Sequence, residues 1–175
     1  MGLDHRVKCC PDGLVTDRRR RIKVLDCTIR DGGICNEWQS DHGVVRRVYQ
    51  ALVESGVDYM EVGYKTQAGL IDPEKVGPWR FCEEHDLQQV VEKNNTLKIA
   101  TMVDVGRITP ADIPPAQDSS IDVIRIATYA HQLDEAMRLL DHSLEMGYET
   151  FMNVMAVSTL SPQEVDDFLY RLRGS

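Results

Sequence analysis

Residues 22–33 read IKVLDCTIRDGG, an apolar run that ends in an arginine, an aspartate and two glycines. Aliphatic and β-branched residues dominate positions 22–29, which predicts a strand buried on both faces of a sheet. Alternation along this strand would place Asp26, Thr28 and Arg30 on one face. Because a permanent charge in a buried strand must be paired, the stretch also predicts a polar site where the strand ends.

The alternation of strands and helices continues to the end of the chain. Apolar runs predict strands over 57–64, 97–104, 122–129 and 150–157, and amphipathic patterns predict helices over 40–56, 77–94, 132–147 and 161–173. This order is typical of a parallel sheet with helical crossovers, as in a (β/α) barrel or a doubly wound sheet. The proline-rich segment 105–121 is expected to hold at most a short helix. Five units amount to part of an eight-unit barrel.

Local signals mark several helix ends. Ser40 or Asp41 can accept a hydrogen bond from the first turn of the helix that follows, and Gly56 can end that helix. Ser161 and Glu164 have the spacing of a capping box at the start of the last predicted helix.

The composition is that of one globular domain. The 175 residues are 42% hydrophobic and 27% charged, and no linker divides them. We therefore expect a basic, solvated N-terminal arm over 1–21 and one domain over 22–175. A net charge of −8 argues against binding to nucleic acid or to an anionic membrane, so a small-molecule ligand is favoured. The lack of a long apolar segment and of a signal-peptide core predicts a cytoplasmic protein.

Polar residues gather where the predicted strands end. Arg30 and Asp31 follow the first strand, Glu61 lies in the second, and Arg125 and Asn153 lie in the fourth and fifth. Ligands of parallel α/β proteins bind at these carboxyl ends. We expect Glu61 to pair with Arg30 across adjacent strands, and Asp31 to offer a hard oxygen ligand for Mg²⁺ or Mn²⁺. A cation and an arginine together can stabilise the negative oxygen of an enolate.

These residues also have a purely structural interpretation. Arg30, Asp31 and Glu61 can form an ordinary buried ion-pair network, and the two glycines that follow can simply shape a sharp loop. Arg125 can likewise bind a substrate carboxylate or pair with an acidic neighbour inside the protein. Composition and spacing leave both interpretations open.

The segment LDCTIRDGGICNEW, residues 25–38, resembles the first-strand signature of the DRE-TIM metallolyases. This superfamily includes HMG-CoA lyase, isopropylmalate and homocitrate synthases and 4-hydroxy-2-oxovalerate aldolase. GVDYMEVGY, residues 56–64, resembles the second-strand segment that supplies a glutamate, and residues 122–136 are similar to the fourth strand of the hydroxy-oxovalerate aldolases. The continuation DGGxxNxW resembles a branch of HMGL-like aldolases.

The resemblance implies an α/β fold in which this chain forms the first five units of a TIM barrel, as the N-terminal part of an HMGL-like aldolase domain. It implies a divalent metal, Mn²⁺ or Mg²⁺. It also implies that a carbon–carbon bond is made or broken through the enolate of a 2-oxo acid or an acyl-CoA. Asp31 would be the metal ligand, Arg30 would steady the enolate, and Glu61 would hold Arg30 in place.

Two features depart from the family pattern. The family completes its metal site with a His-x-His pair on the seventh strand, and none of the five histidines of this chain has that spacing. The aldolases also carry a histidine base soon after the Arg-Asp-Gly motif. This chain has Asn36 in that region, and an amide can hydrogen-bond a substrate but cannot act as a base near neutral pH. His131, just past the fourth strand, could contact substrate or transfer a proton, and Asn153 could bind substrate.

Two other functions stay open. The chain could be a catalytically incompetent barrel fragment, or a small open-sheet module whose Arg-Asp-Gly segment binds an anion. Because five parallel strands cannot close a barrel, the first and last strands would expose unpaired backbone groups. We therefore expect the chain to associate with itself.

Overall fold

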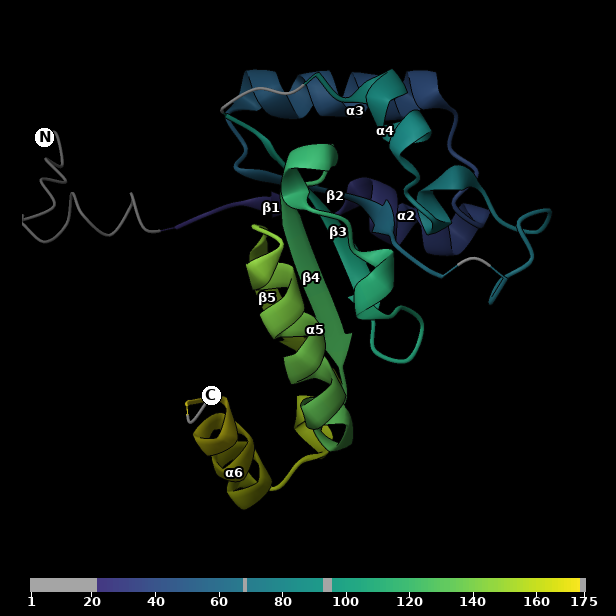
Figure 1. The fold of residues 1–175 in the computed structure, drawn as a ribbon. Helices are drawn as coiled ribbons and strands as arrows, with labels where there is room; N and C mark the ends of the chain where they lie inside the picture. The colour runs from purple at the N-terminus through teal and green to yellow at the C-terminus, as the bar shows by residue number, and fades with distance from the viewer. Residues whose placement is uncertain (1–21, 68, 93–95, 174–175) are drawn as a thin grey trace, which may run out of the picture.

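Five parallel strands form one curled sheet in the computed structural model, which describes residues 22–67, 69–92 and 96–173 (Figure 1). The strands follow one another in the sheet in chain order, and each neighbouring pair is parallel. They are β1 (Leu25–Asp26), β2 (Tyr59–Tyr64), β3 (Lys98–Asp104), β4 (Val123–Thr128) and β5 (Glu149–Val154). This confirms the predicted α/β fold class, the first five units of a TIM barrel. The predicted arm over 1–21 lies outside the described residues.

Helices occupy the connections between the strands. The α-helices are α2 (Thr28–Asn36), α3 (His42–Ser55), α4 (Glu84–Val90), α5 (Leu133–Glu145) and α6 (Pro162–Arg173). Short 3₁₀ turns are η1 (Pro78–Arg80), η2 (Pro110–Asp112), η3 (Ala116–Asp118), η4 (Ala130–Gln132) and η5 (Val157–Thr159). Helix α2 packs on β2, α5 packs on β4 and β5, and α3 packs against α4 (Figure 1). None of the helices in the described part of the chain has the length and apolarity to cross a membrane.

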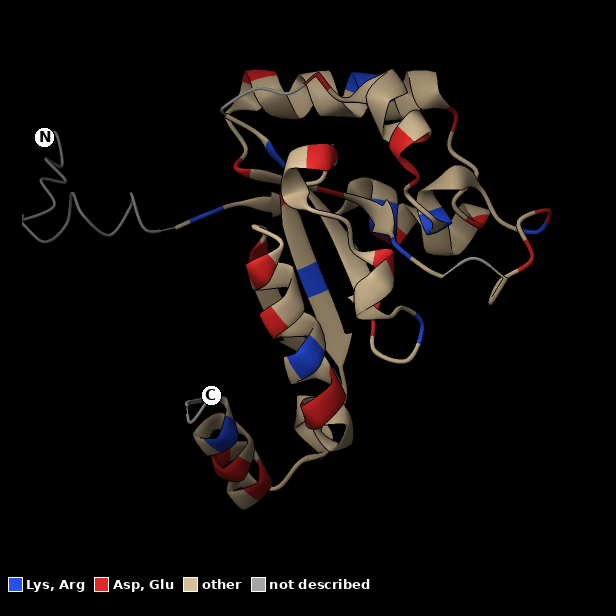
Figure 2. Cartoon of the chain, viewed as in Figure 1, with Lys and Arg blue, Asp and Glu red and all other residues tan. Residues whose placement is uncertain are grey.

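The two faces of the sheet differ because side chains alternate along each strand. The outer face carries the main core, in which strand residues Met60, Val62, Ile99, Val103, Ile124 and Ile126 join helix residues such as Val45, Leu87 and Leu139. The inner face holds a smaller cluster of Tyr59, Ala100 and Val123, with Leu25 packed against it. Glu61 and Arg125 lie two residues after Tyr59 and Val123, so they share this inner face. Arg125 is the single charged residue of β4, whereas the outer helices carry many charges (Figure 2).

The first strand is much shorter than predicted, and this changes where the motif residues lie. Strand β1 ends at Asp26 and helix α2 begins at Thr28, so the predicted strand over 22–29 is wrong beyond Asp26. The prediction that Asp26, Thr28 and Arg30 share one strand face is wrong for the same reason. The Asp26 carboxylate accepts hydrogen bonds from the Thr28 backbone N–H at 3.0 Å and from its hydroxyl at 2.8 Å. Such a local acceptor competes with the sheet for backbone donors and turns the chain into a helix.

The helix predicted over 77–94 is also interrupted. The segment forms the 3₁₀ turn η1 and then the short helix α4, and residues 93–95 lie outside the described residues. Cys82, between the two, has a φ of 47°, a left-handed conformation that a continuous α-helix cannot contain.

Other helix predictions are confirmed. The Asp41 carboxylate accepts a hydrogen bond from the Val44 N–H at 2.9 Å, and α3 ends at Gly56 with a φ of 69°. At the start of α6, the Ser161 N–H donates to Glu164 Oε2 at 2.7 Å and the Glu164 N–H donates to Ser161 Oγ at 3.3 Å. The segment 105–121 contains only the turns η2 and η3, as its prolines predict.

Candidate active site

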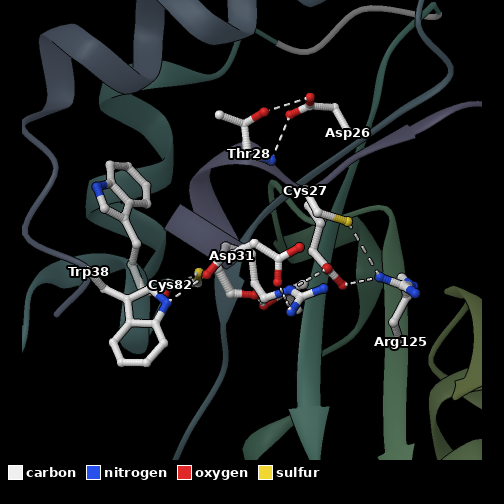
Figure 3. Close-up of polar contacts among 12 residues, drawn as sticks. Asp26, Cys27, Thr28, Asp31, Trp38, Cys82 and Arg125 are labelled. Atoms are coloured by element: carbon white, nitrogen blue, oxygen red, sulfur yellow. Dashed lines mark hydrogen bonds and ion pairs between the residues drawn. The ribbon is translucent and has the colours of Figure 1, made fainter. Parts of the chain in front are cut away.

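Glu61 is the centre of a charged group on the inner face of the sheet. Its side chain is fully buried, with 0% exposure. One carboxylate oxygen, Oε2, accepts a hydrogen bond from Arg30 Nε at 2.7 Å, and the other, Oε1, accepts one from Arg125 Nη1 at 2.7 Å (Figure 3). The buried carboxylate therefore has a guanidinium on each oxygen, which is the condition under which such a charge is tolerated.

The two arginines reach Glu61 from different elements. Arg30 lies in the first turn of α2, and Arg125 lies on β4, which is separated from β2 by β3. The predicted contact between Arg30 and Glu61 is thus present, although Arg30 reaches it from a helix. The side chains of Arg30 and Arg125 keep 14% and 15% exposure, so each guanidinium is partly accessible from the inner face.

Electrostatics in this group favour a charged arginine. Burial alone would lower the pKa of Arg30, but the hydrogen bond and the charge of Glu61 outweigh it and raise the pKa above its usual value. The Cys27 thiol lies 3.9 Å from Arg125 Nη1 (Figure 3). Burial and then the charge of Glu61 raise the pKa of Cys27, so the thiol stays protonated and is a poor nucleophile.

Asp31 lies at the open side of the group. Its Oδ1 atom accepts a hydrogen bond from Arg30 Nη1, and its side chain is 57% exposed. An exposed carboxylate is a hard oxygen ligand and fits a divalent cation as one member of a ligand set. In the described residues, no group of three or more His, Cys, Asp or Glu side chains could hold a metal ion. Asp31 can therefore supply one ligand, and these residues do not complete the site.

The two glycines after Asp31 are part of helix α2, so the prediction that they shape a sharp loop is wrong. Gly32 lies in open space, where an added Cβ would meet no atom within 4 Å. Gly33 is buried against the indole ring of Trp38, and an added Cβ would lie 2.0 Å from Trp38 Cδ1. Of these two glycines, only Gly33 is required by close packing.

The other predicted substrate residues lie in separate places. Asn36 is exposed at the end of α2 and donates a hydrogen bond from Nδ2 to Ser40 Oγ at 3.0 Å. His131, in η4, stacks on the Tyr129 ring with centroids 5.7 Å apart. Both rings line a cleft of about 440 Å³ next to α6.

Asn153 is half-buried on β5 and lines a cavity of about 240 Å³ on the inner face. Arg125 and Tyr59 line the same cavity. The structure therefore brings Asn153 near Arg125, whereas it gives Asn36 and His131 contacts of their own.

Two residues beside this group were not predicted. Tyr64, the last residue of β2, places its ring 5.9 Å from the Arg30 guanidinium carbon. Arg80, in η1, places its guanidinium carbon 4.1 Å from the centroid of the Tyr64 ring, and the residue is only 6% exposed. The signal in the sequence is an arginine beside Trp79 within an apolar stretch, but nothing local shows that it faces Tyr64.

No family model matches the chain. A 4-hydroxy-2-oxovalerate aldolase of Geobacillus genomosp. 3 is 29% identical over 148 residues, which cover 84% of this chain and 43% of that protein. A 4-hydroxy-2-oxovalerate aldolase of Serratia proteamaculans is 30% identical over 146 residues, which cover 83% of this chain and 44% of that protein. The chain thus spans less than half the length of these curated relatives.

Solved structures show the same fold. The N-terminal domain of an aldolase-like protein from Bacteroides vulgatus matches with a TM-score of 0.67 and 26% identity, over 87% of this chain and 60% of that one. The HMG-CoA lyase of Brucella melitensis matches with a TM-score of 0.57 and 12% identity, over 87% of this chain and 57% of that one. The second match shows the fold alone. Sequence similarity to the aldolases extends along more than four fifths of the chain, and the sheet matches the N-terminal domain of an aldolase-like protein, so the chain is similar to the N-terminal part of a DRE-TIM metallolyase domain.

Proposed function

We propose that the chain carries part of the active site of a metal-dependent aldolase or lyase, which makes or breaks a carbon–carbon bond through an enolate. The observation that carries the proposal is the pair of arginines held by one buried carboxylate, Glu61, at the inner face of the sheet. A buried ion pair contributes little net stability, so its retention is better explained by a task.

Arg30 is the residue that stabilises the enolate oxygen. In the cleavage of a 4-hydroxy-2-oxo acid, the C4 hydroxyl loses its proton to a base and becomes the carbonyl of the aldehyde product. The electron pair of the C3–C4 bond then enters the enolate of the 2-oxo acid, and negative charge grows on the C2 oxygen. A guanidinium has five N–H donors in a planar fork. Glu61 engages Nε and Asp31 engages Nη1, and the fork still presents further N–H donors toward the inner face. Glu61 acts by holding this fork in a fixed orientation.

Arg125 and Asn153 bind the substrate carboxylate in the inner-face cavity. Arg125 is oriented by Glu61 through Nη1, and an arginine fork matches the geometry of a carboxylate. That cavity has a volume of about 240 Å³. The similarity to 4-hydroxy-2-oxovalerate aldolases supports a 2-oxo acid over an acyl-CoA as substrate. Asn36 and His131 provide additional substrate contacts outside this cavity.

Asp31 holds the divalent metal, Mn²⁺ or Mg²⁺, as one oxygen ligand among others. When bound, such an ion acts as a Lewis acid that polarises the substrate carbonyl. The Asp31 carboxylate is exposed next to the Arg30 fork, so Asp31 would hold such an ion beside the guanidinium.

The proposal is tested by calorimetric titration of the chain with oxalate, a stable mimic of the planar enolate of pyruvate, with and without excess Mn²⁺. We expect Mn²⁺ to strengthen oxalate binding, and Arg30→Lys and Arg125→Lys to weaken it. Arg107→Lys is the matched control, because Arg107 is an exposed arginine that pairs with Asp104 away from Glu61.

Equal oxalate affinity in the wild type and in both Glu61-linked variants would overturn the proposal. Oxalate binding that is lost in those variants but does not depend on Mn²⁺ would instead identify the chain as an anion-binding module.

A further inference from the structure

The segment that follows α2 has an unusual backbone. Glu37 and Trp38 are consecutive non-glycine residues with left-handed φ angles of 55° and 58°. This conformation is unfavourable for residues with a Cβ, so the surrounding structure must hold it. The Trp38 N–H donates to the Gly33 carbonyl at 3.0 Å, and the Gly77 N–H donates to the Glu37 carbonyl at 2.7 Å. The chain is thereby folded back so that Trp38 lies against the helix it has just left.

Two glycines make room for this arrangement. A Cβ on Gly33 would lie 2.0 Å from Trp38 Cδ1, and a Cβ on Gly77 would lie 1.9 Å from the Trp38 carbonyl oxygen. A side chain at either position would therefore displace Trp38. The glycine at 33 and the tryptophan at 38 are both part of the DGGxxNxW pattern, so this pattern encodes one packing unit.

Trp38 supports Arg30 in two ways, directly through a hydrogen bond and indirectly through Tyr64. Its indole Nε1–H donates to the Arg30 carbonyl oxygen at 3.1 Å, which holds the backbone that carries the catalytic guanidinium. Its ring also meets the Tyr64 ring edge-on, with centroids 5.6 Å apart and planes at 88°. The Tyr64 ring in turn lies 5.9 Å from the Arg30 guanidinium carbon. Trp38 thus supports both the backbone of Arg30 and the ring beside its guanidinium.

Arg80 supports the two rings from the other side. Its guanidinium carbon lies 4.9 Å from the Trp38 ring centroid and 4.1 Å from that of Tyr64. Asp104 pairs with Arg80 at 3.5 Å, and this keeps the arginine over the rings. A cation between two aromatic faces is favourable when it is shielded from water, and Arg80 is only 6% exposed.

We propose that Trp38 is a positioning residue for Arg30: its indole N–H and its contact with Tyr64 set the orientation in which the guanidinium meets Glu61. Its meaning for catalysis rests on the proposed function, but the positioning itself does not. Trp38 need not touch substrate, because it acts through Arg30.

The test is an NMR measurement on the ¹⁵N-labelled chain. The Arg30 Nε–H, which donates to Glu61, should give a separate and slowly exchanging signal that is assigned by its loss in Arg30→Lys. Trp38→Phe keeps an aromatic ring but removes the N–H donor, and we expect the Arg30 signal to shift and its protection from exchange to be lost. The backbone amide of Val62, in the core of β2, serves as the internal reference for global stability and should stay protected.

Trp79→Phe is the matched control. Trp79, the other tryptophan of the chain, also donates from Nε1 to a backbone carbonyl, that of Ser40 at 2.7 Å, but it lies in the outer core. Trp79→Phe should lower the global stability, but it should not shift the Arg30 signal or reduce its protection from exchange more than that of Val62. Gly33→Ala, which displaces the indole, should reproduce the effect of Trp38→Phe, whereas Gly32→Ala should not.

The positioning role would be overturned if the Arg30 signal keeps its shift and its protection from exchange in Trp38→Phe. It would also be overturned if the protection of Arg30 falls only as much as that of the Val62 amide. Oxalate provides the separate check on the proposed function. If oxalate with Mg²⁺, which is diamagnetic, leaves the wild-type Arg30 signal unmoved while Trp38→Phe still disturbs it, the proposed function fails and the positioning role stands.

Discussion

The role of Arg30, the first residue of the Arg-Asp-Gly motif, depends on the shape of its side chain as much as on its charge. Arg30 must hold Glu61 through Nε while its Nη atoms remain available to Asp31 and to a substrate oxygen. A lysine keeps the positive charge but presents a single ammonium group. Replacing Arg30 by lysine therefore tests the geometry of the side chain separately from its charge.

We predict that Arg30→Lys lowers turnover by about 10²–10³ in a form of the protein that cleaves 4-hydroxy-2-oxo acids, because a donor to the developing oxyanion is lost. Folding should be largely unaffected, since the charge opposite Glu61 is retained. Steady-state kinetics and the melting temperature measure the two effects. Turnover equal to that of the wild type would remove Arg30 from the chemistry.

We predict that Asp31→Asn weakens Mn²⁺ binding by about tenfold or more, whereas Asp104→Asn leaves it unchanged. Asp31 is exposed beside the Arg30 fork, while Asp104 faces the two arginines Arg80 and Arg107 at 3.5 and 3.8 Å. Calorimetric titration with Mn²⁺ distinguishes the two carboxylates. Equal losses in both variants would count against Asp31 as the ligand.

At the scale of the elements, the start of the strands is held by a polar contact across the inner face. Glu149, the first residue of β5, accepts hydrogen bonds from the Tyr59 hydroxyl at 2.7 Å and from Lys98 Nζ at 2.6 Å. These residues begin β2, β3 and β5, so one carboxylate links three strands that are not all neighbours. Burial and then the hydrogen bond to Glu149 raise the pKa of Tyr59 to about 12.

This contact predicts how stability depends on pH. Burial alone would raise the pKa of Glu149, but the hydrogen bonds from Lys98 and Tyr59 outweigh it and lower the pKa below the usual 4.5. A carboxylate whose pKa is lower in the folded state stabilises the fold above its unfolded pKa, and this contribution is lost as the pH falls through the folded pKa. Urea unfolding at pH 7 and at steps below pH 4.5 should show this loss in the wild type.

Glu149→Gln should be less stable at pH 7 and should lose less stability in acid. The control is Glu145→Gln, an exposed glutamate at the end of α5, which should behave like the wild type. Parallel pH profiles for the wild type and Glu149→Gln would show that the contact does not stabilise the sheet.

At the scale of the whole molecule, the five strands form an open sheet. Strands β1 and β5 lie at its edges, and an edge strand presents backbone N–H and C=O groups that can pair with another chain. The inner face also exposes Phe151, which is 42% accessible although it lies in a strand. The open edges and this apolar surface favour association.

We predict that residues 1–175, purified alone, form dimers or larger species and do not cleave 4-hydroxy-2-oxo acids with added Mn²⁺. Asp31 without a set of further protein ligands would bind the ion weakly, because such an ion keeps several waters. Light scattering gives the mass, and release of the aldol cleavage products gives the activity. A monomer with metal-dependent turnover would show that these 175 residues suffice for the reaction.

The sequence alone determined the order of strands and helices, the parallel sheet and the pairing of Arg30 with Glu61. Hydrophobic periodicity reports which segments are buried on which faces, and a buried charge requires a partner of opposite sign. Both are local properties of residue types, so they can be read without coordinates. The resemblance to the DRE-TIM metallolyases is confirmed by the comparisons with known aldolases, which match more than four fifths of the chain.

Only the tertiary structure decided how the site is assembled. The chain forms helix α2 where a strand was predicted, with the Asp26 carboxylate bonded to Thr28 at its start, so Arg30 reaches Glu61 from a helix. Arg125 meets the same carboxylate from 64 residues away in sequence, and Trp38 meets Tyr64 across the turn after α2. Such contacts join segments that are distant along the chain, and their geometry depends on the packing of the whole sheet. No periodicity within one segment carries that information, because each contact is set by where two separately formed elements come together.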